Sequence, residues 1–193
     1  ISATAGGIGQ ALLRQQLQRG PVISLSRQPQ PSLEYQPEHP WQHIQIDLSD
    51  PRCVTPLSQT LEPYRIEQVF ACTGILHSEQ QQPEKSLRSL DRDWLLHSID
   101  INVLTHVHLA QALDSKVSAS RPLRWMSLSA KVGSIEDNGL GGWYSYRMSK
   151  AALNMLIKNL AIEWGRKSPI SIVTAVHPGT TDTQLSMPFQ RNI

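Results

Sequence analysis

A tyrosine and a lysine stand four residues apart, at Tyr146 and Lys150, in a stretch with the pattern of a helix. Residues with this spacing share one face of a helix, so the phenol and the ammonium would be neighbours. A positive charge beside a phenol stabilises the phenolate, lowers its pKa and lets the tyrosine exchange a proton near neutral pH. The spacing is common by chance, and a surface helix with two solvated side chains is its usual explanation. The rest of the chain must decide between them.

Strands and helices are expected to alternate along the 193 residues. Helical spacing of apolar residues predicts helices at 10–19, 51–63, 91–113 and 144–165. Short apolar or alternating runs predict strands at 22–25, 43–48, 66–72, 123–128 and 170–176. The last strand is continuously apolar, which is typical of a strand covered on both faces. This order predicts one α/β domain over residues 1–193, a parallel sheet with helices on both faces.

Composition excludes several classes of function. The chain has 18 basic and 16 acidic residues, and a net charge of +2 indicates neither a nucleic-acid partner nor an anionic membrane. No apolar run approaches the ~20 residues of a membrane span. The cysteines, Cys53 and Cys72, have no metal-ligand spacing, and the seven histidines form no metal motif. We therefore expect no metal site, and a cytoplasmic protein with reduced thiols.

Glycines and polar residues gather where ligands bind in open α/β sheets, beyond the carboxyl ends of the strands. Gly7, Ile8 and Gly9 open the first helix, where backbone N–H groups can approach a pyrophosphate, although a plain tight turn is an alternative. Arg27 follows the strand at 22–25 and can accommodate a 2′-phosphate, or can be a solvated loop residue. The remaining candidates at strand ends are Asp47, Leu48, Gly74, Ser127, Ser129, Pro178, Gly179, Thr180 and Thr183.

The conjunction of these motifs resembles the short-chain dehydrogenase/reductase family over nearly the whole chain. The Gly-x-Gly helix start, the Tyr-x-x-x-Lys helix after the strand at 123–128 and Pro178-Gly179 after the last strand carry the resemblance. Segments 139–155 and 177–193 resemble the branch of bacterial C-factor (C-signal) relatives. The resemblance implies a Rossmann-like, doubly wound parallel sheet, and it makes a chance Tyr-x-x-x-Lys the weaker explanation.

The resemblance also implies roles for single residues. Tyr146 would be the general acid in carbonyl reduction or the base in alcohol oxidation, and Lys150 would lower its pKa and hold the nicotinamide ribose. Ser129 would hydrogen-bond the substrate oxygen, with Ser127 as its substitute. Asn102 would order a proton-relay water, although taken alone it is better explained as a satisfied polar residue in a helix.

The implied cofactor is NADP(H) rather than NAD(H), because Arg27 follows the strand at 22–25 and residues 25–28 contain no Asp or Glu. Asp47 and Leu48 could touch an adenine, although Asp47 could equally cap the helical segment from residue 51. Thr180 and Thr183 would contact the nicotinamide amide or the phosphates. The full set of implied cofactor contacts is Gly7, Ile8, Gly9, Arg27, Asp47, Leu48, Gly74, Tyr146, Lys150, Pro178, Gly179, Thr180 and Thr183.

Four features depart from the family pattern. Ala3 occupies the first glycine position, and its methyl group is expected to crowd the tight turn. The Asn-Asn-Ala-Gly motif is replaced by Ala71-Cys72-Thr73-Gly74. Counted back from Gly133, the family serine falls on Ala130, one residue after Ser129. Only Ile1 and Ser2 precede the glycine turn, whereas a strand has about 5–6 residues, so we expect the first strand to be missing. The chain also ends soon after Pro178-Gly179, where the family continues with another helix and strand.

These observations predict an NADP(H)-dependent oxidoreductase that transfers hydride between nicotinamide and a small carbonyl or alcohol substrate. Two alternatives stay open: a non-catalytic signalling or regulatory protein of the same fold, and an inactive truncated product. By resemblance, the helices at 91–113 and 144–165 would form a homodimer or homotetramer interface. The apolar faces of these helices could also simply cover the sheet.

Overall fold

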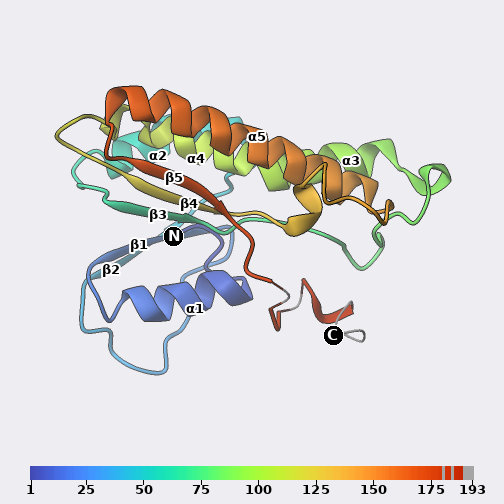
Figure 1. The fold of residues 1–193 in the computed structure, drawn as a ribbon. Helices are drawn as coiled ribbons and strands as arrows, with labels where there is room; N and C mark the ends of the chain where they lie inside the picture. Colours follow the sequence, from blue (N-terminus) through green and yellow to red (C-terminus); the bar gives the residue numbers. More distant parts are fainter. Residues whose placement is uncertain (180, 184, 189–193) are drawn as a thin grey trace.

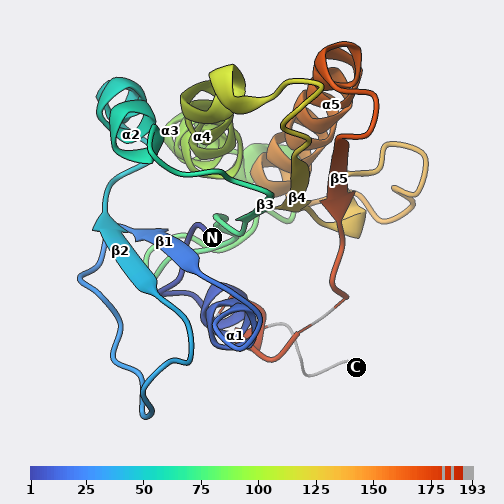
Figure 2. The ribbon, with the colours of Figure 1, turned by 90° about the vertical axis from the view of Figure 1, so that its left-hand side faces the viewer.

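The computed structural model describes residues 1–179, 181–183 and 185–188, and all its strand pairs are parallel. β1 (Val22–Ser26) pairs with β2 (Trp41–Gln45). β4 (Arg124–Leu128) lies between β3 (Gln68–Ala71) and β5 (Ile172–Val176). Across the molecule the strands follow the order β2, β1, β3, β4, β5 (Figure 2). The hydrogen-bonded strands form two parallel sheets, β1–β2 and β3–β4–β5, and the predicted Rossmann-like fold is confirmed.

Helices cover both faces of these strands (Figure 1). One face carries α1 (Gly7–Gln16), and the other carries α2 (Val54–Leu61), α4 (Thr105–Leu113) and α5 (Tyr144–Lys167). α3 (Arg92–Ile99) continues into α4 through a π-helical turn at Asp100–Leu104. Short 3₁₀ turns lie at Pro51–Cys53, Leu87–Ser89, Asp114–Lys116 and Lys131–Gly133. None of the helices in the described part of the chain is long and apolar enough to cross a membrane.

Three sequence predictions differ from the structure. α1 begins at Gly7 rather than residue 10, because Gly6 in extended conformation is its N-cap. β2 begins two residues before the predicted strand, where it pairs Trp41 with Val22. The prediction that the last strand is covered on both faces is wrong: β5 ends the strand order, and Ile172 and Thr174 are exposed.

The main core lies between the sheet and the helices α2, α4 and α5. Trp125 of β4 and Trp164 of α5 meet edge to face with ring centroids 5.6 Å apart. The Trp164 indole also donates to Asp114 Oδ1 at 2.8 Å. Leu153 and Ile157, both buried, continue this contact along α5. The packing fixes the rotation of α5 and so directs its Tyr146–Lys150 face toward the carboxyl ends of the strands.

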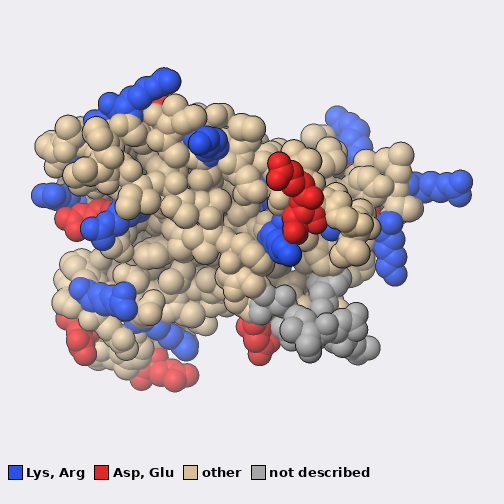
Figure 3. Space-filling model, viewed as in Figure 1, with Lys and Arg blue, Asp and Glu red and all other residues tan. Residues whose placement is uncertain are grey.

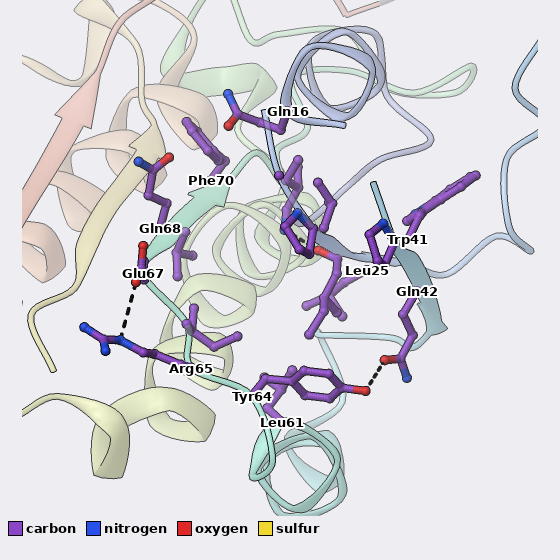
Figure 4. Close-up of a pocket in the computed structure, with 18 of the residues that line it drawn as sticks. Gln16, Leu25, Trp41, Gln42, Leu61, Tyr64, Arg65, Glu67, Gln68 and Phe70 are labelled. Carbon is purple, nitrogen blue, oxygen red and sulfur yellow. Dashed lines mark hydrogen bonds and ion pairs between the residues drawn. The ribbon is translucent and has the colours of Figure 1, made fainter. Parts of the chain in front are cut away.

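A groove separates β1 from β3, and residues 1–4 close one end of it. Ile1 accepts a backbone bond from Leu25 of β1 at 2.8 Å, and Ser2 donates to Phe70 of β3 at 2.9 Å. The groove encloses about 820 Å³ and is lined by residues of β1, β3, α4 and the segment after α2. At its mouth the Tyr64 hydroxyl donates to Gln42 Oε1 at 2.6 Å (Figure 4). Residues 1–4 thus bridge β1 and β3 at one end, and the groove fills the rest of the space between these two strands.

Charged side chains of both signs are interspersed on the face shown in Figure 3. The ion pairs involve exposed partners, such as Lys131 with Asp137 at 3.3 Å. Exposed pairs of this kind contribute little to stability. The face shown therefore has no large field of one sign to attract a polyanion.

Candidate active site

Lys150 and Tyr146 lie together at the start of α5, as their spacing predicts. The Lys150 ammonium lies 5.8 Å from the centroid of the Tyr146 ring and donates to the Leu128 carbonyl oxygen at 2.9 Å. Only 3% of Lys150 and 9% of Tyr146 are exposed. Trp143 covers the other part of the tyrosine, with ring centroids 6.3 Å apart. The solvated-surface explanation of this pair is therefore wrong, because both side chains are buried at the carboxyl end of β4.

Burial governs the protonation of both groups. Burial raises the pKa of Tyr146 to about 12, so the expected lowering by Lys150 is not seen in this structure. Burial also lowers the pKa of the Lys150 ammonium to about 8, although the nearby Cys72 thiol opposes this. At neutral pH, Tyr146 holds its proton and Lys150 is mostly charged. Tyr146 is therefore in its acid form, with a cation beside its ring.

Asn102 and Gly74 complete the surroundings of Lys150. The Asn102 side chain accepts from the Ile75 amide at 2.7 Å and donates to the Ile75 carbonyl at 2.9 Å and to Ser149 Oγ at 2.9 Å. A Cβ added to Gly74 would lie 3.2 Å from Asn102 Oδ1 and 3.3 Å from Lys150 Nζ. Asn102 is thus a fully satisfied buried residue, and it also joins the loop after β3 to the helix of Lys150.

The two candidate serines have different surroundings. Ser127 is fully buried, and its hydroxyl contacts His106 Nδ1 at 3.0 Å and accepts from the Trp125 indole at 2.8 Å. Ser129 donates its hydroxyl proton to Asn154 Oδ1 at 2.6 Å. Ser127 is fully buried and both its contacts are inside the protein, so Ser129 is the better placed of the two to meet a substrate. Its hydroxyl is nevertheless engaged with α5.

The glycine turn fits a phosphate but is strained. Ala3 has φ 55°, a left-handed conformation that L-residues with a side chain disfavour. A Cβ added at Gly9 would lie 2.2 Å from the Ala3 carbonyl oxygen, so the helix start needs a glycine there. No side chain caps the first N–H groups of α1. These N–H groups and the positive helix end suit a pyrophosphate. The expected crowding by Ala3 is seen as backbone strain.

The segment after β5 reaches back to this turn. A Cβ added at Gly7 would lie 2.9 Å from Thr183 Cγ2, so the two predicted contacts are neighbours. A hollow of about 450 Å³ lies between the first turns of α1, including Ile8, and residues 181–183. Pro178 and Gly179 are exposed between β5 and this segment, with Gly179 at φ 76°. Thr180 lies outside the described residues.

Of the residues predicted to contact the adenosine part of the cofactor, some already have hydrogen-bond partners within the chain and others are exposed. Arg27 is exposed. Burial opposes a low pKa at Asp47, but hydrogen bonds from Ser49, with a smaller contribution from the charge of Arg27, hold this pKa below its usual value. The helix cap at residue 51 comes from Asp50 rather than Asp47, since Asp50 accepts from the Arg52 amide at 2.9 Å. Leu48 is buried, and its carbonyl accepts from His108 Nδ1 at 2.7 Å. Arg27 and Asp47 are therefore available to a ligand, whereas the Leu48 carbonyl is used.

Sequence reasoning missed three residues that build the site. Asn154 holds Ser129, and its signal was its position four residues after Lys150 on the same helix face. His106 bridges Ser127 and the Thr73 carbonyl, and burial lowers its pKa to about 4. Glu84 contacts the first turn of α5, and only the absence of a capping residue at Trp143 hinted at it. Within the described ranges no group of three potential metal ligands occurs.

Comparison with known proteins agrees with this geometry. The family model of the short chain dehydrogenases matches residues 1–193, so the chain belongs to that family. It is 29% identical over 146 residues to 1-hydroxy-2-glutathionyl-2-methyl-3-butene dehydrogenase of Rhodococcus sp. strain AD45, covering 75% of this chain and 60% of that one. It is 27% identical over 103 residues to C-signal of Myxococcus xanthus, covering 53% of this chain and 61% of that one. The likeness to the C-signal branch is thereby confirmed.

A solved structure extends the comparison to three dimensions. A short chain dehydrogenase from Burkholderia cenocepacia J2315 superposes with a TM-score of 0.74 at 22% identity, covering 96% of this chain and 74% of that one. This likeness establishes the shared fold. The chain spans about three fifths of the length of the two curated relatives.

Proposed function

We propose that this chain is the proton-transfer and cofactor-binding part of an NADP(H)-dependent oxidoreductase acting on a small carbonyl or alcohol. The observation that carries the proposal is the buried pair of Tyr146 and Lys150, joined through Asn102 and Gly74 to the end of β3. A bound nicotinamide cofactor supplies or accepts the hydride. What the chain itself must provide is a proton at the substrate oxygen and a fixed position for both partners.

Tyr146 is the proposed proton donor. Because its pKa is about 12, it is protonated at neutral pH and can give its proton to an oxygen on which negative charge develops. Lys150, held by the Leu128 carbonyl, places a positive charge beside the phenolate that remains. Ser129 is the proposed substrate-oxygen contact, but its hydrogen bond to Asn154 makes its contribution small. Asn102 is the residue that keeps the loop after β3 against α5. The arrangement favours carbonyl reduction.

The proposed cofactor contacts lie at three places along the chain. The first turn of α1, with Gly7, Ile8 and Gly9, would hold the pyrophosphate, and Thr183 borders it. Arg27 would pair with a 2′-phosphate and Asp47 would face the adenine, which supports NADP(H) over NAD(H). The Burkholderia cenocepacia relative was solved in complex with NADP, so a cofactor of this size suits the shared fold.

The test is a comparison of the full chain with its Tyr146→Phe and Arg27→Ala variants. NADPH-dependent reduction of a panel of aldehydes, ketones and quinones should fall at least about a hundredfold in Tyr146→Phe, with NADPH affinity within twofold of wild type. Arg27→Ala should weaken NADPH and leave NADH unchanged. Full turnover by Tyr146→Phe, or tighter binding of NADH than of NADPH by the wild type, would overturn the corresponding part.

A second function is favoured by two departures near the site. Ala3 strains the glycine turn, and counting back from Gly133 puts the family's serine position on Ala130. Both are compatible with a signalling or regulatory protein that binds a nucleotide without turnover, or with an inactive product. NADPH fluorescence on mixing separates these: binding without reduction supports the regulatory protein, and no binding supports the inactive one.

Self-association is the proposed assembly. Met148, Met155 and Ile162 are exposed along α5 and could pack against a second copy to give a homodimer or homotetramer. Light scattering of the wild type and of a Met155→Lys variant would test it, since a charge in this face should release monomers. A monomeric wild type would contradict the proposal.

A further inference from the structure

The start of α5 lacks a cap of its own. Trp143 is the N-cap residue, in a left-handed conformation with φ 51° and ψ 43°, and its side chain makes no capping hydrogen bond. The first turn of α5 also contains no acidic residue. The leading N–H groups of a helix have no partner within the helix and need an acceptor from elsewhere. Tyr146 lies in this turn, so whatever caps it also fixes the proposed proton donor.

Glu84 supplies the missing cap from a loop 61 residues away in sequence. Its carboxylate oxygens accept from the Ser145 amide at 3.3 and 3.2 Å, and the Ser145 hydroxyl donates to Oε1. The Glu84 carbonyl oxygen accepts from the Trp143 amide at 2.5 Å. Glu84 is 4% exposed and Ser145 is fully buried. One residue thus holds both the cap position and the second residue of the helix.

The chemistry suits a buried carboxylate. None of the ion pairs within the described ranges involves Glu84, so its charge is balanced by Ser145 and by the positive end of the α5 dipole. A buried charge that lost these donors would be strongly unfavourable. Gly142 is shaped to the same contact: its φ is 64°, and an added Cβ would lie 3.3 Å from the Glu84 carbonyl oxygen. The loop and the helix start are therefore built around each other.

We infer that Glu84 is a positioning residue for Tyr146, holding the first turn of α5 and the Trp143 ring that packs against the phenol. This inference rests on the proposed function only for its effect on turnover. Within the described ranges Glu84 makes no hydrogen bond or ion pair with Tyr146 or Lys150, and it acts through Ser145 and Trp143. It also links two parts of the site, because its loop begins at Gly74, beside Lys150 and Asn102.

The test uses Glu84→Gln in the full chain, with Glu79→Gln as matched control. Both variants remove one negative charge from the same loop, but Glu79 is exposed. Hydrogen exchange of the Ser145 and Tyr146 amides should accelerate about tenfold in Glu84→Gln, the typical effect of losing a helix cap, and exchange beyond Leu153 should stay unchanged. NADPH affinity should stay within twofold, and kcat should fall about tenfold at unchanged KM. Glu79→Gln should match the wild type in all of these.

Ser145→Ala and the double variant close a cycle. If Glu84 acts through Ser145, the double variant should exchange no faster than the more affected single variant. The inference would be overturned if the two single-variant increases in exchange rate multiplied in the double variant. It would also be overturned if the amides of Glu84→Gln exchanged at the wild-type rate. Exchange needs no turnover, so the two proposals fail separately. A wild type without reductase activity whose first turn loosens in Glu84→Gln supports the positioning role and refutes the function.

Discussion

The Ser129 hydroxyl donates to Oδ1 of Asn154 across 2.6 Å, and Asn154 in turn donates to the Gly133 carbonyl oxygen at 3.3 Å. Asn154 stands one helical turn after Lys150, so the end of β4 is tied to the helix that carries the proton donor. A serine with its proton committed in this way is a poor donor to a substrate oxygen. The next residue is Ala130, on which the family's serine position falls when it is counted back from Gly133.

This contact predicts an asymmetry between two variants. Ser129→Ala should lower kcat/KM less than about threefold, because it removes a hydroxyl already engaged with Asn154. Ala130→Ser should raise kcat/KM about tenfold, since one added donor to a developing oxyanion can supply such a factor. Steady-state NADPH oxidation with one carbonyl substrate checks both. A hundredfold loss in Ser129→Ala would show that Ser129 turns toward the substrate after all.

The pKa of Tyr146 predicts that kcat/KM depends differently on pH in the two reaction directions. Since burial raises this pKa to about 12, the acid form needed for reduction is present throughout pH 6–9. The phenolate needed for oxidation should increase about tenfold per pH unit over that range. We therefore expect kcat/KM for reduction to be flat up to about pH 7 and to fall above about pH 8, where Lys150 loses its charge. For alcohol oxidation we expect kcat/KM to rise with pH below about pH 8. A plateau of oxidation near pH 7 would mean that Lys150 lowers the pKa once ligands bind.

Ala3→Gly should relieve the strain at the glycine turn. A residue with a side chain at φ 55° loses roughly 1–2 kcal/mol relative to a favoured conformation, and glycine does not. We expect about 1 kcal/mol more stability in urea unfolding and tighter NADPH binding. Ala5→Gly is the control: Ala5 is exposed and its φ is not positive, so glycine there should be neutral or slightly destabilising. Equal effects of the two variants would contradict the strain argument.

The groove between β1 and β3 should accept a parallel strand. The backbone groups of even-numbered β1 residues hydrogen-bond to β2 and the residues that flank it, as the Val22 amide does with the Pro40 carbonyl oxygen. The backbone groups of odd-numbered residues such as Ile23 therefore face the groove. Adding five β-branched residues before Ile1 should stabilise the chain by at least about 3 kcal/mol, through backbone bonds and buried side chains. A Gly-Ser extension of equal length should not. Thermal unfolding of the two extended chains measures the difference, and equal melting temperatures would refute the expectation.

The same extension should change the pH dependence of stability. Burial lowers the pKa of the Ile1 ammonium from 8.0 to about 6. Between these values the unfolded chain binds more protons, so stability should rise from pH 6 to pH 8 and be fully present above pH 8. An extension turns this amine into an amide and should remove the rise. A slope that survives in the extended chains would have to come from another group.

The sequence was sufficient for much of this molecule because its local patterns agree with its tertiary structure. Apolar runs located every strand, and the spacing of Tyr146 and Lys150 located the buried pair. Burial could not be derived in the same way: the pKa of Tyr146 depends on the surroundings that Trp143 and the sheet create. Contacts between distant segments were also missed. The hydrogen bond between Glu84 and Ser145 spans 61 residues of sequence, and its one local signal is the lack of a capping side chain at Trp143.

The π turn at Asp100–Leu104 makes the site sensitive to chain length as well as to residue identity. Such a turn holds one residue more than an α-helical turn, and each residue advances a helix by about 100°. Asn102 lies within it, while His106 lies beyond it and contacts Ser127. A single-residue deletion here would rotate one against the other by more than a quarter turn. An insertion or deletion in this helix would therefore misplace either Asn102 or His106 relative to its partners in the site.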